Sequence, residues 1–153
     1  MTTLIKGTDL RLMNYGLKVD RATATLPTTA TGSIFTVTVG RIMVTGLIGV
    51  VTTAIQAQAT TLKVVATPTT GAVNDLSGTV DVNGLAAGGL LGLTGLAADA
   101  LVKSTGGGVS SLRNPICVAV GAIGIATGAT STGSIAWTLL YVPLDVGAAV
   151  AAA

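Results

Sequence analysis

The stretch SIFTVTVGRIMVTGLIGVV, residues 33–51, is dominated by Val, Ile and Thr. Branching at Cβ restricts these side chains against the preceding turn of a helix and suits them to a pleated strand. The stretch therefore predicts two strands, at residues 33–39 and 42–51. The same bias along the chain predicts further strands at residues 18–26, 60–67, 116–125 and 134–142.

Residues 76–84, LSGTVDVNG, give the clearest alternation of apolar and polar positions. Leu76, Val80 and Val82 are expected on one face and Asp81 on the other, followed by a type I′ turn at 83–84, because Asn and Gly tolerate positive φ. Short strands at this spacing predict an all-β, single-domain β-sandwich or jelly-roll-like barrel. We assign residues 17–153 to this domain and residues 1–16 to a short N-terminal arm.

The segment 84–111 is rich in both Gly and Leu. We expect a short strand at 90–93, a helical turn at 96–102 and a loop at 104–111. An apolar segment that must stay covered is a candidate subunit contact. The predicted subunit interface combines this segment with the last long strand and comprises Leu90, Leu91, Leu93, Trp137 and Tyr141. For the two aromatic residues, packing in the core or in an interface is expected, because large aromatics usually anchor a core, and a sugar-binding platform is the alternative.

The composition argues against an enzyme, because the chain has no His, no Glu and a single Cys. Groups that titrate near neutral pH carry most acid–base and nucleophilic catalysis. Cys117 lies in an apolar run and is expected to be a buried small hydrophobe. The six Asp residues are dispersed along the chain without a calcium-loop pattern. We therefore expect no catalytic residue, metal, cofactor or small-molecule substrate.

Charge and hydropathy narrow the possible partners. The basic residues occur singly and only four residues are aromatic, which disfavours nucleic-acid binding. Lys18, Asp20 and Arg21 are typical of a charged strand edge that blocks unwanted sheet pairing. Residues 42–62 and 114–144 carry no charge, but polar residues and turn formers interrupt both, so we expect no membrane span. The N-terminal residues do not resemble a signal peptide, which predicts synthesis in the cytoplasm without secretion.

Residues 21–71 and 122–153 resemble small structural proteins of tailed-bacteriophage virions. The most specific pieces are RATATLP at 21–27, TAIQ at 53–56 and YVPLD at 141–145. The resemblance implies a β-sandwich or jelly-roll subunit, often trimeric, attached to the outside of the head as a decoration or fibre-base protein. Its partner would be the major capsid protein, and it would be made in the host cytoplasm and located on the capsid exterior.

These observations together predict a non-enzymatic virion protein that decorates and reinforces a capsid. The arm would dock on the shell through Leu4, Ile5, Leu10, Leu12 and Tyr15, which are apolar residues outside the best strand patterns. Two alternatives remain open at this point, a membrane-associated apolar protein and a surface glycan-binding module.

Overall fold

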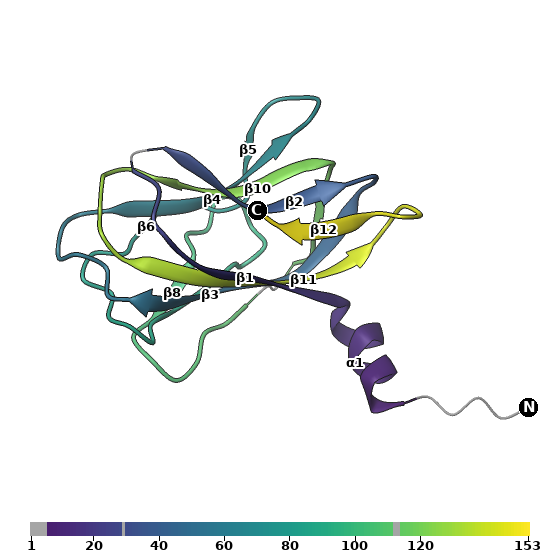
Figure 1. Cartoon of the computed structure of the whole chain (residues 1–153), viewed down its shortest axis with the longest axis horizontal. Coiled ribbons are helices and arrows are strands. Elements are labelled where there is room, and N and C mark those ends of the chain that lie inside the picture. The colour runs from purple at the N-terminus through teal and green to yellow at the C-terminus, as the bar shows by residue number, and fades with distance from the viewer. Residues whose placement is uncertain (1–5, 29, 112–113) are drawn as a thin grey trace, which may run out of the picture.

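A computed structural model describes residues 6–28, 30–111 and 114–153. Half of the chain is strand and 6% is helix, and the strands form two antiparallel sheets. The described strands close no barrel, so the predicted all-β sandwich is confirmed and the barrel alternative is not observed. Figure 1 shows the two sheets as stacked layers, with one short helix projecting from one end.

The first sheet has six strands, of which five run in the order β1-β11-β3-β7-β8 and β9 also pairs with β3. Its centre is the long pair β3 and β11, which correspond to the predicted strands at 42–51 and 134–142. The strands are β1 (Leu17–Thr25), β3 (Ile42–Thr53), β7 (Leu90–Gly92), β8 (Val102–Ser104), β9 (Ile116–Val118) and β11 (Ser134–Pro143).

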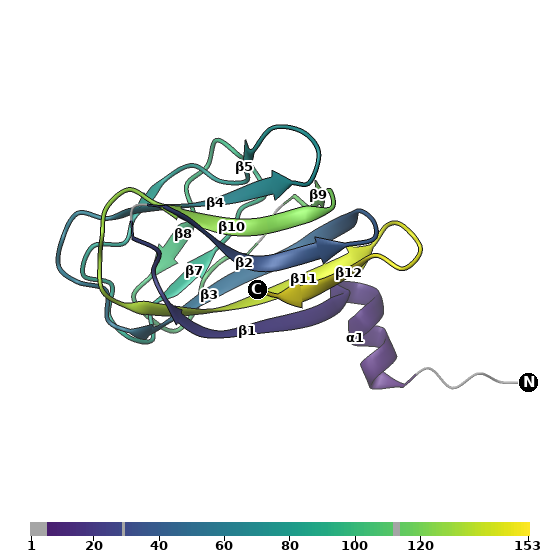
Figure 2. The same ribbon diagram turned by 45° about the horizontal axis from the view of Figure 1, so that its top comes forward.

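The second sheet also has six strands, in the order β12-β2-β10-β4-β5, with β6 pairing with β4. They are β2 (Thr31–Thr38), β4 (Thr61–Pro68), β5 (Asn74–Asp75), β6 (Val80–Asp81), β10 (Gly121–Thr127) and β12 (Ala149–Ala152). The edge strands β1 and β12 of the two sheets lie side by side in Figures 1 and 2. The Arg21 Nε donates a hydrogen bond to the main-chain oxygen of Ala153 (2.9 Å) and links these edges.

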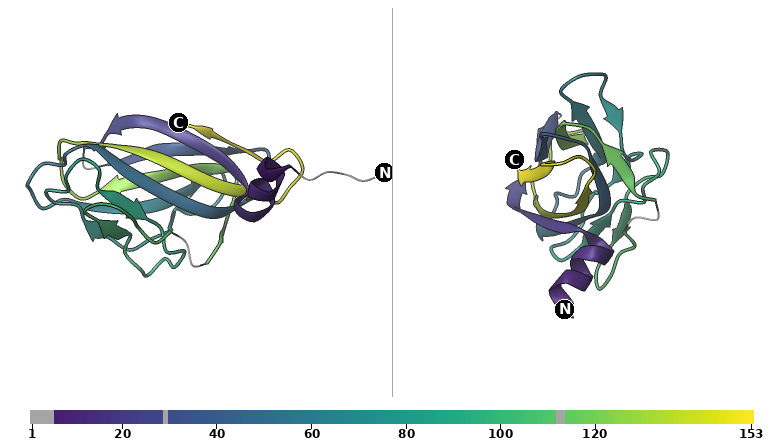
Figure 3. Two further views of the ribbon diagram at one scale, coloured as in Figure 1. Left: turned by 90° about the horizontal axis from the view of Figure 1, so that it is seen from below. Right: turned by 90° about the vertical axis from the view of Figure 1, so that its right-hand side faces the viewer.

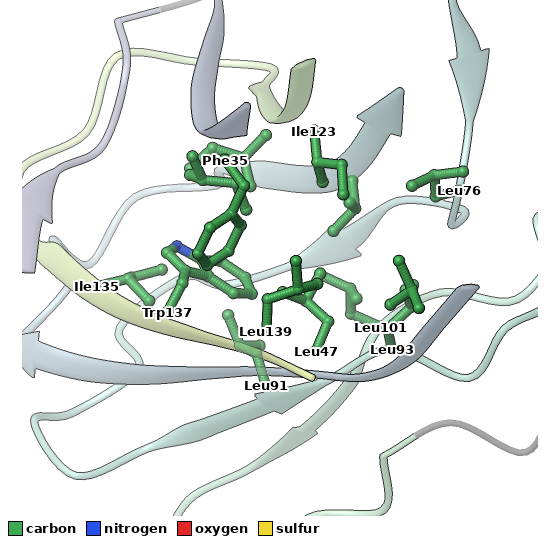
Figure 4. Packing of buried hydrophobic residues seen from close by; sticks show 14 of the residues in the cluster. Phe35, Leu47, Leu76, Leu91, Leu93, Leu101, Ile123, Ile135, Trp137 and Leu139 are labelled. Atoms are coloured by element: carbon green, nitrogen blue, oxygen red, sulfur yellow. The ribbon is translucent and has the colours of Figure 1, made fainter. Parts of the chain in front are cut away.

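The core lies between the inner faces of the two sheets, and Trp137 is its largest side chain. Strand β11 alternates in burial as predicted, so Ile135, Trp137, Leu139 and Tyr141 all point inward. Figure 4 shows the indole of Trp137 packed below Phe35 of the opposite sheet. Burying side chains of this size contributes roughly 1.5–3 kcal/mol each.

Several local predictions are wrong, each because tertiary packing overrides a local pattern. Residues 76–82 alternate in burial except at Ser77, but only Val80–Asp81 pairs as a strand in this stretch. The turn at 82–85 has positive φ at Gly84 but not at Asn83, so it is not type I′. Residues 96–99 form a turn, in which the Asp99 N–H donates to the Leu96 oxygen (3.0 Å). Ala100 then forms an isolated bridge with Gly78, and Val102 begins β8, so no helical segment spans 96–102.

The predicted strand at 116–125 is in fact two strands in different sheets. β9 pairs with β3 of the first sheet, whereas β10 pairs with β2 and β4 of the second. The chain crosses between them at Gly121, whose φ is +149° and where a Cβ would collide with the main-chain oxygen of Thr67. Strand β12 was not predicted, because a run of Ala and a single Val carries little strand signal.

Candidate docking surface

The helix α1 (Gly7–Tyr15) precedes the first strand. The main-chain N–H of Lys6 donates to the carboxylate of Asp9 (3.1 Å), which also places a negative charge near the positive end of the helix dipole. The helix ends at Gly16, whose φ is +81° and whose N–H donates to the oxygen of Leu12 (2.9 Å). A side chain at Gly16 would collide with the main-chain oxygen of Tyr141, so this glycine brings the helix close to the sheet.

No residue of α1 is buried, although several of its side chains are large and apolar. Met13 is 74% exposed, Leu10 and Tyr15 are each 55% exposed, and Leu12 is 46% exposed. Leu12 and Tyr15 face a groove of about 590 Å³ above Leu140 of β11. A helix shorter than about 12–15 residues is marginal in water without packing. The helix therefore presents apolar surface that the other described residues do not cover.

Further exposed apolar residues lie at the same end of the sandwich as α1, in the turn after β2 and the loop after β11. Figure 3 shows this loop and the helix at that end. We call this region the helical end. Its exposed large apolar residues are Leu10, Leu12, Met13, Tyr15, Leu17, Val39, Val142, Leu144 and Val146. Clustered apolar surface of this kind is typical of an interaction site.

An ion pair joins the two loops of the helical end. The Arg41 guanidinium donates to both carboxylate oxygens of Asp145 (3.0 and 2.8 Å), and the Arg41 main-chain N–H also donates to one of them (2.8 Å). These hydrogen bonds from Arg41 lower the pKa of the Asp145 carboxyl to about 2. The Asp145 carboxyl therefore stays ionised, and able to pair with Arg41, over the physiological pH range.

Val39, at the tip of the turn after β2, has a φ of +68° and is 74% exposed. A β-branched residue in this region is strained by about 1–3 kcal/mol, and such strain often marks a functional position. Val39 is therefore a candidate contact residue that the sequence did not indicate.

The predicted docking residues can now be placed. Leu10, Leu12 and Tyr15 are exposed on α1, whereas Leu4 and Ile5 lie outside the described residues. Met13 and the loop residues Leu144 and Val146 were missed. A search for apolar residues at turns could have found Leu144 and Val146, but only the fold brings them to the same end of the sandwich as the helix.

The predicted subunit-interface residues are placed mainly in the core. Leu91, Leu93, Trp137 and Tyr141 are all less than 5% exposed, and only Leu90 keeps partial exposure. Side chains packed inside one chain have little surface left to contact a second subunit, so these four residues belong to the core of the sandwich. The burial of Trp137 likewise leaves no open ring face for a sugar platform.

Cys117 is exposed, which corrects its predicted burial. It is the middle residue of β9, in which the side chain of Val118 points into the core and the side chain of Cys117 points outward. The acidic residues stay dispersed, and the described part of the chain contains no group of three potential metal ligands. Within the same residues, no helix combines the length and apolarity needed to cross a bilayer.

Comparisons with protein-family models, with curated proteins and with solved structures find no match for this chain.

Proposed function

We propose that the chain is a non-enzymatic structural protein of a tailed-phage virion that decorates and reinforces the outer face of the capsid. The observation that carries this proposal is the exposed apolar helix α1 at one end of a β-sandwich. The partner would be the major capsid protein, contacted through the helical end. The chain would then be made in the host cytoplasm and located on the virion exterior.

Shell binding would account for the exposure of the helical end. Burying apolar side chains contributes about 25 cal/mol per Å², so covering the exposed parts of Leu10 and Met13 would contribute on the order of 1 kcal/mol each. The same contact would stabilise a helix that is too short to persist alone. A specific interface covers about 800 Å² on each partner, so the neighbouring loops would also take part.

The proposed reinforcement of the capsid would come from contacts that bridge neighbouring capsomers. A protein that contacts neighbouring capsomers adds interfaces that must break before the shell can open. The long pairing of β3 with β11, which two bulges interrupt, would be the scaffold for this role. We further propose that the chain acts as a homotrimer, which analytical ultracentrifugation of the purified protein would test.

The docking experiment uses two matched variants of the full-length chain. Met13→Asp removes the most exposed apolar side chain of α1, whereas Asn14→Asp adds the same charge at the neighbouring exposed polar position, outside the groove. Binding is measured by co-sedimentation with purified heads that lack the protein. We expect at least tenfold weaker binding for the first variant and less than threefold change for the second.

The same variants show whether a loss of binding comes from a lost contact or from a lost fold. Because α1 buries no side chain, both should keep the circular dichroism spectrum and thermal stability of the wild type. Equal binding of the apolar and polar variants, or undiminished binding after deletion of residues 1–16, would contradict the docking site.

A membrane-associated protein is the alternative that the exposed apolar helix also permits. Flotation with vesicles of neutral and of anionic lipid tests it directly. Wild-type protein that floats with vesicles but does not sediment with heads would replace the capsid proposal by membrane association.

A further inference from the structure

Asp99 is the one acidic side chain that has no partner among the described residues. Its carboxylate accepts no hydrogen bond from them and forms no ion pair, and the residue is exposed. The other acidic side chains all accept hydrogen bonds within the chain: Asp9, Asp20, Asp75, Asp81 and Asp145. Asp99 shares the turn at residues 96–99, which we call the acidic turn, with Leu96, whose side chain is 46% exposed. The acidic turn therefore offers a partner both an apolar side chain and a negative charge.

The backbone of the acidic turn is held at both ends. The Asp99 N–H donates to the Leu96 oxygen (3.0 Å), and the Gly78 N–H donates to the Asp99 oxygen (2.8 Å). Gly78 and Ala100 form an isolated bridge, and a Cβ at Gly78 would lie only 2.9 Å from the oxygen of Ala98. A turn that is ordered before binding loses little conformational entropy when a partner covers it.

The groove of about 590 Å³ beside α1 has the complementary properties. Leu12 and Leu140 make part of it apolar, and its two charged lining residues, Arg11 and Lys18, are both basic. Lys18 is engaged by Asp20 (2.7 Å), whereas Arg11 is exposed and forms no ion pair with a described residue. The groove therefore matches an apolar side chain that is followed closely by a carboxylate, and Arg11 is the cation that would meet that carboxylate.

The groove and the acidic turn lie toward opposite edges of the first sheet. The groove is lined by α1, β1 and β11, and β1 is the strand at one edge. The acidic turn connects β7 with β8, and β8 is the strand at the other edge. Figure 2 shows α1 well apart from β7 and β8. A contact between the groove and the acidic turn therefore has to join two copies of the chain.

We propose that the groove beside α1 receives the acidic turn of a second copy of this chain. Leu96 of the turn packs on the apolar part of the groove, and Asp99 pairs with Arg11. The two surfaces differ, so the contact is head-to-tail, and repeating it by rotation closes a ring. This inference rests on the proposed homotrimer and gives it an interface, to which residues around the groove and the turn also contribute area.

The helix has room for this contact and for the capsid. At 3.6 residues per turn, the groove residues 8, 11, 12 and 15 lie on one face of α1. Leu10 and Met13 fall on the opposite face and are exposed. One face therefore contacts the neighbouring copy, and the other stays available to the shell.

A charge exchange tests the pairing in the full-length chain. Arg11→Asp, Asp99→Arg and the double variant Arg11→Asp/Asp99→Arg are compared with the wild type by sedimentation velocity over a range of concentrations, without heads. Each single variant places like charges together and should raise the midpoint concentration of assembly at least tenfold. The double variant restores opposite charges and should return the midpoint to within threefold of the wild type.

Lys6→Asp is the matched control. It makes the same charge change on an exposed residue directly before α1 that does not line the groove, so it should move the midpoint less than threefold. All three changed positions are exposed, and circular dichroism will show whether each variant keeps the fold.

Two results would overturn the proposed contact. The wild type could stay monomeric at every concentration, which would remove the homotrimer as well. The trimer could also form equally in wild type and Arg11→Asp, or fail to return in the double variant, which would place the trimer contact on another surface. A trimer that obeys the charge exchange but does not sediment with heads would support this contact and contradict only the capsid proposal.

Discussion

Gly49→Ala is expected to destabilise the protein through the side chain opposite. A Cβ at Gly49 would lie 2.8, 3.0 and 3.1 Å from the Cζ3, Cη2 and Cε3 atoms of Trp137. Carbon atoms in van der Waals contact prefer separations of about 3.5–4.0 Å, so the ring would have to move by roughly half an ångström or more. Trp137 is only 1% exposed, so this movement disturbs the centre of the core.

The magnitude results from opposing effects. Overpacking a core costs about 1–3 kcal/mol, whereas replacing Gly restricts the unfolded chain and stabilises by about 0.4–1 kcal/mol. A cavity beside β1, which Trp137 helps to line, gives the indole room to shift, which favours the lower part of the overpacking range. We therefore expect a net loss of about 1 kcal/mol, which lowers the Tm by roughly 2–4 °C for a chain of this size.

Urea denaturation followed by far-ultraviolet circular dichroism measures this loss. Gly46→Ala on the same strand is the matched control, because its Cβ would meet a flexible atom, Cδ1 of Leu140, at 3.0 Å. We expect less than half the effect there. Phe is shorter than Trp, so Gly49→Ala should cost almost nothing in a Trp137→Phe background. An equal cost of Gly49→Ala in both backgrounds would refute the proposed collision.

Three further outcomes are expected. Because Arg41 depresses the pKa of Asp145, this pair stabilises the fold above about pH 4, and its contribution is lost as the pH falls toward 2. Asp145→Asn should therefore lower the midpoint of urea denaturation at pH 7. An equal difference in midpoint between wild type and variant at pH 2 would argue against the ion pair. Exposed Cys117 should react fully with a thiol reagent in the native protein, and Cys117→Ser should change the free energy of unfolding by less than about 0.5 kcal/mol. A thiol that reacts only after the protein is unfolded would contradict its exposure. Val39→Asn should raise the free energy of unfolding by about 1 kcal/mol, since Asn tolerates positive φ; a lower stability would show that Val39 is not strained.

The candidate docking surface shows where prediction from sequence stops. Leu10, Leu12 and Tyr15 stand out in the sequence because they lie outside any strand pattern. Their exposure depends on which of the described elements cover them, and their position at the same end of the sandwich as Leu144 and Val146 depends on how β11 and β12 are connected. Neither their exposure nor this arrangement can be inferred from residues that are close in the sequence.

The sequence by itself determined that the chain is all-β and which side chains of the long strands point inward, as in the alternation from Ile135 to Tyr141. Those properties follow from sterics at Cβ and from the two-residue repeat of a strand, which act over a few residues. The tertiary structure alone decided that 116–125 divides between two sheets, that Cys117 faces outward, and that Trp137 borders a cavity beside Arg21. These outcomes depend on pairing and packing between residues far apart in the chain, and local sequence patterns carry no information about which distant strand lies opposite.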